Sequence, residues 1–142
     1  MINWDFSAPE LSTLKDNDVS AISQSLAGKN IALLICGSIA AYRAPDIVRI
    51  LRKHGAKVQV YASRSALSFV SANSLEWSSG NKVISDLSAD AEHLEGKFDF
   101  DLFMMAPATY NSINKMAQGI ADDVIPLVMA VAAGLLERGK TK

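Results

Sequence analysis

Small polar residues follow three apolar segments of the sequence at the points where each segment ends. They are Gly37 and Ser38 after IALLIC (31–36), Ser63 and Ser65 after KVQVYA (57–62), and the stretch PATYN (107–111) after DLFMMA (101–106). A strand that turns into a helix within two or three residues leaves the first N–H groups of that helix facing whatever lies above the strand end. Such a turn is suited to an anion, and phosphate is its usual ligand.

The turn at 37–40 is the strongest of these candidates. Gly37 allows close approach of the backbone, Ser38 offers a hydroxyl, and the N–H groups from Ile39 and Ala40 onward would face a phosphate oxygen. The segment contains neither GxGxxG nor GK[ST], so it is neither a dinucleotide fingerprint nor a P-loop. A mononucleotide phosphate fits better. A plain strand-to-helix connection without a ligand stays open as the alternative.

Two other side chains could do chemistry, and each also has an ordinary structural interpretation. His93 can exchange a proton near neutral pH, although a single histidine in a polar stretch is usually a solvated loop residue. Asn111 can orient a ligand through its amide, although a residue there is usually part of a turn or cap. The lone cysteine, Cys36, is typical of a small core side chain. One cysteine and two histidines favour neither a disulfide nor a metal cluster.

Alternating strand and helix patterns predict the scaffold that positions these residues. We expect strands at 31–36, 57–62, 82–85 and 101–106, and helices from Ala41 to a stop at Gly55 and at 63–71, 109–119 and 123–137. This order predicts an α/β, doubly wound, Rossmann-like (flavodoxin-like) parallel sheet flanked by helices, in a single domain. In such a sheet the ligand lies beyond the carboxyl ends of the strands, where the three polar turns would converge.

Length and charge limit the remaining possibilities. The 142 residues suffice for one domain, which we assign to 30–142, with a partly helical extension at 1–29 that carries a stripe at Val19, Ile22 and Leu26. With 14 basic and 15 acidic residues, the net charge of −1 predicts neither nucleic-acid nor membrane binding. The longest apolar run, 124–136, is too short to span a bilayer. We therefore expect a soluble, cytoplasmic protein.

Several separated blocks resemble the flavoprotein family of cysteine decarboxylases, which includes phosphopantothenoylcysteine decarboxylase and the enzymes that oxidatively decarboxylate lantibiotic peptides. The blocks are GSIAAYRAPDIVRILRKHGAKVQV, SRSALSFV and APATYNSINKMAQGIADD, and the resemblance covers 31 to about 130. The resemblance implies FMN as cofactor, with its phosphate at the glycine-serine turn. The family segment PASANT corresponds to PATYNS here, which implies that Asn111 is catalytic. The family histidine lies eight residues before the aspartate that opens the fourth strand, as His93 lies before Asp101.

The predicted site combines these residues. Catalytic roles are assigned to His93 and Asn111. Cofactor-binding roles are assigned to Gly37, Ser38, Ile39, Ala40, Ser63, Ser65, Phe69, Ala106, Pro107, Ala108 and Thr109. The implied reaction is oxidative decarboxylation of a cysteinyl carboxylate in coenzyme A biosynthesis, and the implied assembly is a homo-oligomer, a trimer or a multiple of trimers.

The chain also departs from the family pattern. It ends at GLLERGKTK, without the further strand, the PAMN-like turn and the downstream cysteine of the decarboxylases, so the domain is expected to be a fragment or a short relative. The segment EHLEGKFDFD around His93 is unusual as well. The alternatives are a non-catalytic or regulatory FMN-binding subunit, a peptidyl-cysteine decarboxylase and a relative of the flavin prenyltransferases. The turn GSIA at 37–40 fits the decarboxylases better than the prenyltransferases, whose turn resembles GASG.

Overall fold

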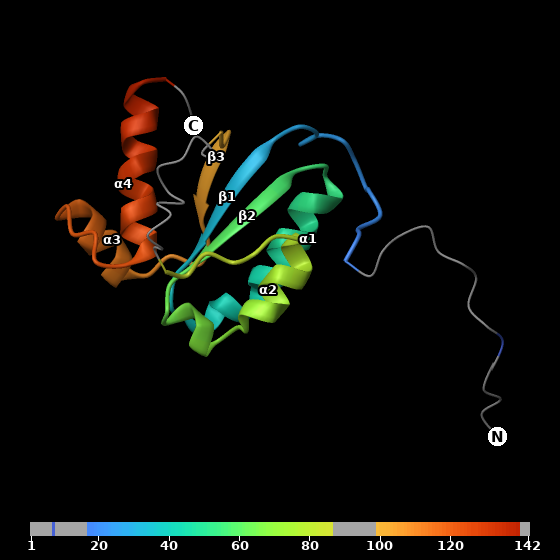
Figure 1. Cartoon of the computed structure of the whole chain (residues 1–142), viewed down its shortest axis with the longest axis horizontal. Coiled ribbons are helices and arrows are strands. Elements are labelled where there is room, and N and C mark those ends of the chain that lie inside the picture. The colour runs from blue at the N-terminus through green and yellow to red at the C-terminus, as the bar shows by residue number, and fades with distance from the viewer. Residues whose placement is uncertain (1–6, 8–16, 87–98, 140–142) are drawn as a thin grey trace.

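A parallel three-stranded sheet forms the centre of the molecule in the computed structural model, which describes residues 7, 17–86 and 99–139 (Figure 1). The strands are β1 (Asn30–Ile35), β2 (Lys57–Ala62) and β3 (Leu102–Met105), in the order β2-β1-β3. The central strand β1 pairs Ile31 with Val58 on one side and with Leu102 on the other. All three strands therefore end at the same edge of the sheet.

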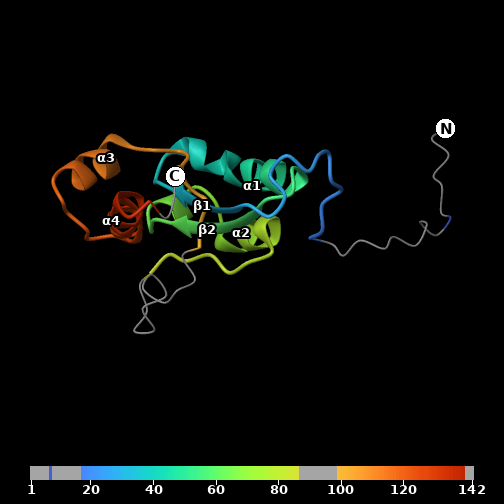
Figure 2. The same ribbon diagram turned by 90° about the horizontal axis from the view of Figure 1, so that it is seen from above.

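Helices cover both faces of this sheet (Figures 1 and 2). On one face lie α1 (Ala44–Lys53) and α2 (Ala72–Ser79), and on the other lies α4 (Val124–Glu137), with α3 (Tyr110–Ala117) packed against it. Successive residues of β1 alternate between two cores: Leu33 packs with Val48 of α1, whereas Leu34 packs with Ile125 of α4. The predicted doubly wound α/β fold is confirmed. No helix in the described part of the chain has the length and hydropathy to cross a membrane.

The predicted strand at 82–85 is reduced to a single parallel bridge between Ile84 and Tyr61. Side chains take up the polar backbone groups that a longer ladder would use. The Glu76 carboxylate accepts from the N–H of Val83 at 3.1 Å, and the Asn81 amide donates to the carbonyl of Val58 at 2.9 Å. The strand prediction was therefore wrong in extent, although the segment does lie beside β2.

Two predicted helices differ from expectation, one in how it begins and the other in its length. The first starts as a 3₁₀ helix, η1 (Ile39–Arg43), which passes directly into α1. The helix predicted at 63–71 is only the 3₁₀ helix η2 (Ala66–Ser68). The Ser71 hydroxyl accepts from the N–H of Ser74 at 3.1 Å, and this cap starts α2 as a separate helix.

The described part of the N-terminal extension packs on the end of α1 without forming a helix. The N–H groups of Ile22 and Leu26 donate to the carbonyls of Lys53 and His54, each at 2.8 Å. The Ser23 hydroxyl also lies 2.6 Å from Nδ1 of His54. Because the last carbonyls of a helix lack partners within the helix, they are free to accept these hydrogen bonds. The predicted helical stripe is therefore a capping segment instead.

Candidate functional site

The turn after β1 presents backbone N–H groups at the carboxyl edge of the sheet. Ser38 is extended, with φ of −139°, and its hydroxyl accepts from the N–H of Ala40 at 3.3 Å. In the described part of the chain, the N–H groups of Gly37, Ser38 and Ile39 have no hydrogen-bond acceptor. Free donors at the start of a helical segment favour an anionic ligand.

The loop after β2 lies directly against this turn. A Cβ built on Gly37 would lie 2.2 Å from Oγ and 2.5 Å from Cβ of Ser65, so only glycine fits. Ser63 is 2% exposed, its N–H donates to the carbonyl of Ile35 at 3.0 Å, and its hydroxyl accepts from the N–H of Ala66 at 3.1 Å. The Ser63 and Ser65 hydroxyls share a hydrogen bond of 3.0 Å. Two of the predicted polar turns thus meet in space.

The segment after β3 joins the same edge. The Ala106–Pro107 peptide bond is cis, the N–H of Ala106 donates to the carbonyl of Leu34, and the carbonyl of Pro107 accepts from the N–H of Cys36 at 3.1 Å. Cys36 itself is a free, fully buried side chain in the core. The third predicted turn is therefore anchored directly beside the residue that precedes Gly37.

Four of the remaining predicted site residues lie in the described part of the chain, and one does not. Thr109 caps α3 through its Oγ1, which accepts from the N–H of Ser112 at 3.3 Å. Asn111 lies exposed in the first turn of that helix, and Ala108 is exposed just before it. Phe69 ends η2 and is 44% exposed. His93 lies outside the described residues.

A charged cavity of about 370 Å³ at the carboxyl edge was not predicted from the sequence. Its lining includes two ion pairs, Arg64 with Asp86 and Lys115 with Asp122. Each pair joins residues from different elements, and the hydrogen bond from Arg64 to Asp86 raises the pKa of the guanidinium. No motif marks such pairs in the sequence. The only available signal was the position of Arg64 between the two serines of the β2 loop.

Comparisons with known proteins agree with this geometry. The family model "Flavoprotein" matches residues 19–138. The coenzyme A biosynthesis bifunctional protein CoaBC of Escherichia coli (strain K12) is 42% identical over 110 residues, which cover 73% of this chain and 27% of that protein. CoaBC of Borreliella burgdorferi is 38% identical over 108 residues, covering 73% and 28%. The chain thus spans less than a third of the length of these relatives.

Solved structures share the fold. The FMN-dependent cysteine decarboxylase SpaF has a TM-score of 0.66 and 26% identity, over 76% of this chain and 64% of that one. HAL3 from Cryptococcus neoformans has a TM-score of 0.62 and 28% identity, over 70% and 62%. The predicted resemblance to the flavoprotein family of cysteine decarboxylases is confirmed by the sequence relatives and by the solved structures. Since the family model covers most of the sequence, the chain belongs to the flavoprotein family.

Proposed function

We propose that the chain binds FMN, with the phosphate at the turn that starts at Gly37. The close approach of Gly37 to Ser65 carries this proposal, because it brings two strand-end turns together. The free N–H groups of Gly37, Ser38 and Ile39 supply donors, and the paired hydroxyls of Ser63 and Ser65 lie beside them. Uncharged donors of this kind suit a phosphate, and no carboxylate belongs to this set.

The other predicted cofactor residues fit the same group. Pro107 is held beside Cys36 by a backbone hydrogen bond, so the 106–109 segment has a fixed place next to the turn. Phe69 and Ile39 present exposed apolar side chains from η2 and η1. We assign these residues to the rest of the cofactor, which has an apolar ring system as well as a phosphate. The similarity to the FMN-dependent cysteine decarboxylase SpaF supports the assignment.

We further propose that the chain takes part in oxidative decarboxylation of a cysteinyl carboxylate. The names of its CoaBC relatives point to coenzyme A biosynthesis as the pathway. Bound FMN would supply the electron acceptor for oxidation of the thiol. Asn111 would hold the substrate carboxylate through its amide, which donates without adding charge. His93 would exchange a proton with the substrate, because imidazole titrates near neutral pH.

We also propose a cytoplasmic homo-oligomer. Large apolar side chains are exposed on α3, close to the site: Tyr110 is 86% exposed and Ile113 45%. On the outer side of the sheet, β3 pairs with no strand in the described residues, and Leu102 is 38% exposed there. Apolar surface and an open sheet edge are usually covered by a partner.

Two substitutions test the reaction separately from cofactor binding. We expect His93→Asn and Asn111→Ala to keep bound FMN but to lower carbon dioxide release from phosphopantothenoylcysteine by about a hundredfold or more, the usual scale for losing a positioned acid-base group or orienting donor. The protein should be assayed with any longer natural chain or partner that it requires. A variant that turns over like the parent would remove that residue from the mechanism. FMN binding without any carbon dioxide release by the parent would favour the non-catalytic flavin-binding subunit.

A further inference from the structure

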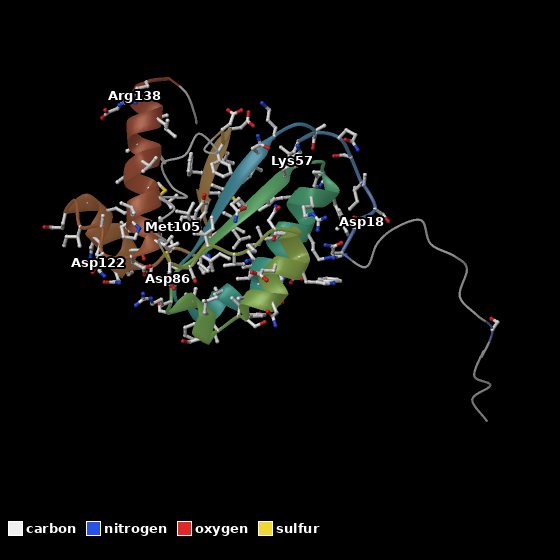
Figure 3. All side chains as sticks on the ribbon, in the orientation of Figure 1. Asp18, Lys57, Asp86, Met105, Asp122 and Arg138 are labelled. Atoms are coloured by element: carbon white, nitrogen blue, oxygen red, sulfur yellow. The ribbon has the colours of Figure 1, made fainter. Side chains whose placement is uncertain are left out.

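A hollow at the amino edge of the sheet lies away from the proposed cofactor turn. Its volume is about 410 Å³, and its lining includes Asp18, Arg52, Lys57, Val58, Ser79 and Asn81. Figure 3 shows Lys57 at this edge, whereas Asp86 lies toward the carboxyl edge, where the strands end. The volume is large enough for a small metabolite. A ligand in this amino-edge hollow would therefore not compete with the cofactor.

Two cationic side chains of the amino-edge hollow have donors that the chain leaves unused. Arg52 donates through Nη1 to the carbonyls of Asn17 and Ser78, at 2.8 and 2.6 Å. Its Nε and Nη2 have no acceptor in the described part of the chain. The Nζ of the exposed Lys57 also has no acceptor among the described residues. Both side chains can therefore donate to a ligand without breaking an ion pair.

The charges around Arg52 favour an anion. Burial lowers the pKa of its guanidinium, and the nearby guanidinium of Arg49 lowers this pKa further. The Asp18 carboxylate raises the same pKa, but by less than these two effects lower it. Arg49 stacks on the ring of Trp77 at 4.7 Å, and its Nη1 is buried without a hydrogen-bond partner. An anion beside Arg52 would offset this excess of positive charge.

A buried backbone N–H adds a third donor. The N–H of Lys57 donates to the carbonyl of Lys29 at 2.8 Å, so the next residue of β2, Val58, directs its N–H away from β1. On that side the Asn81 amide donates to the Val58 carbonyl at 2.9 Å. Within 17–86 and 99–139, however, the N–H of Val58 has no acceptor, although Val58 is only 1% exposed. Because buried N–H groups nearly always have a partner, this one indicates an acceptor that the chain does not supply.

We propose that the amino-edge hollow binds the phosphate group of a small sugar phosphate, held by Arg52, Lys57 and the N–H of Val58. The three donors differ in kind, and all belong to the lining of one hollow. A phosphate has three oxygens that can accept from them, whereas a carboxylate has only two. This site is additional to the FMN phosphate at Gly37.

A smaller hollow of about 220 Å³ continues the site. It shares Lys57, Val58 and Asn81 with the larger hollow, and it adds the amides of Asn30 and Gln59. These two amides donate through nitrogen to backbone carbonyls, at 2.9 and 2.7 Å. In the part of the chain that the structure describes, their oxygens accept no hydrogen bond. A ligand whose phosphate lies in the larger hollow can therefore place sugar hydroxyls here as donors.

Calorimetric titration of the FMN-saturated protein with inorganic phosphate and with ribose 5-phosphate tests the proposal. We expect Lys57→Gln to raise the Kd of both probes by about fivefold to tenfold, the scale for losing a charge-assisted hydrogen bond at a partly exposed site. This variant is chosen because the Lys57 side chain has no other hydrogen bond in the described residues that its loss would break. Lys82→Gln, at an exposed lysine outside both linings, is the matched control and should change either Kd by less than about twofold.

Two further measurements locate the bound phosphate. In the ¹⁵N-labelled protein, the N–H resonance of Val58 should move downfield during the titration, because this group gains an acceptor. Asp18→Asn should tighten phosphate binding by about twofold to fivefold, since it removes a carboxylate from the lining. These results place the probe at the amino edge whether or not the turn at Gly37 holds FMN.

Several results would overturn the proposal. No binding of either probe at about 10 mM would do so, as would equal Kd values for the parent and Lys57→Gln. A Val58 N–H resonance that stays in place while that of Gly37 moves would assign the probe to the cofactor turn. Tighter binding of acetate than of phosphate would assign the hollow to a carboxylate, and weaker phosphate binding by Asp18→Asn would show that the hollow does not hold an anion.

Discussion

Gly37→Ala tests the contact on which the proposed cofactor site depends. The added Cβ would lie 2.2 Å from Oγ, 2.5 Å from Cβ and 3.0 Å from the carbonyl carbon of Ser65. Rotation of the Ser65 side chain can relieve only the first contact, so the 63–65 loop must move away from the turn. Overpacking of this kind costs about 1–3 kcal/mol in the free energy of unfolding. Because the displaced loop also carries the Ser63 and Ser65 hydroxyls, we expect FMN affinity to fall by about tenfold or more.

Urea unfolding and quenching of flavin fluorescence would measure both effects. Ser65→Gly in the Gly37→Ala background removes the side-chain clashes, so it should restore most of the lost stability and give a non-additive double-mutant cycle. Gly134→Ala is the matched control: in the described part of the chain, no atom beyond the adjacent backbone of α4 lies within 4 Å of its added Cβ, and in α4 it should stabilise the protein by about 1 kcal/mol. If Gly37→Ala unfolds at the same urea concentration as the parent and binds FMN equally well, the close contact has no role in the site.

Two further predictions concern stability and assembly. Asp101 accepts hydrogen bonds from Lys29 and from the N–H of Asn30, which lower the pKa of its carboxyl. Asp101→Asn should therefore destabilise the protein at neutral pH. The difference from the parent in urea unfolding should shrink as the pH falls below about 4, where the carboxyl of the unfolded parent takes up its proton, and should vanish once the pH is also below the lowered pKa of Asp101 in the folded protein; a difference that is independent of pH would contradict this. Light scattering at micromolar concentration should give the mass of a trimer or of a multiple of trimers, and Tyr110→Asp should lower it; a folded monomer would contradict the proposed assembly.

The buried part of the fold was predictable because its signal is local. The uninterrupted apolar run at 31–36 reflects a strand covered on both faces, and Leu33 and Leu34 do face different cores. Gly37 was predicted to allow close approach of the backbone, and the structure identifies Ser65 as the group that approaches. The convergence of the strand-end turns followed from the parallel sheet alone.

The errors arose where tertiary contacts replace local preference. Val19, Ile22 and Leu26 have helical spacing, but the backbone of this segment bonds to the carbonyls of Lys53 and His54. The charged cavity depends on pairs separated by 22 residues, Arg64 with Asp86, and by seven, Lys115 with Asp122. Nothing in the sequence around either member indicates its partner, since exposed charges of both signs occur throughout the chain.

A comparison of FMN with riboflavin tests the central claim most directly, because the two ligands differ only in the phosphate. Fluorescence titration of the flavin-free protein should give one FMN bound per chain. Riboflavin should bind about a hundredfold more weakly, as expected if two or more N–H groups of the turn at Gly37 donate to the phosphate. Equal affinity for the two ligands would show that the turn does not hold the phosphate, and failure to bind either would contradict the proposed cofactor.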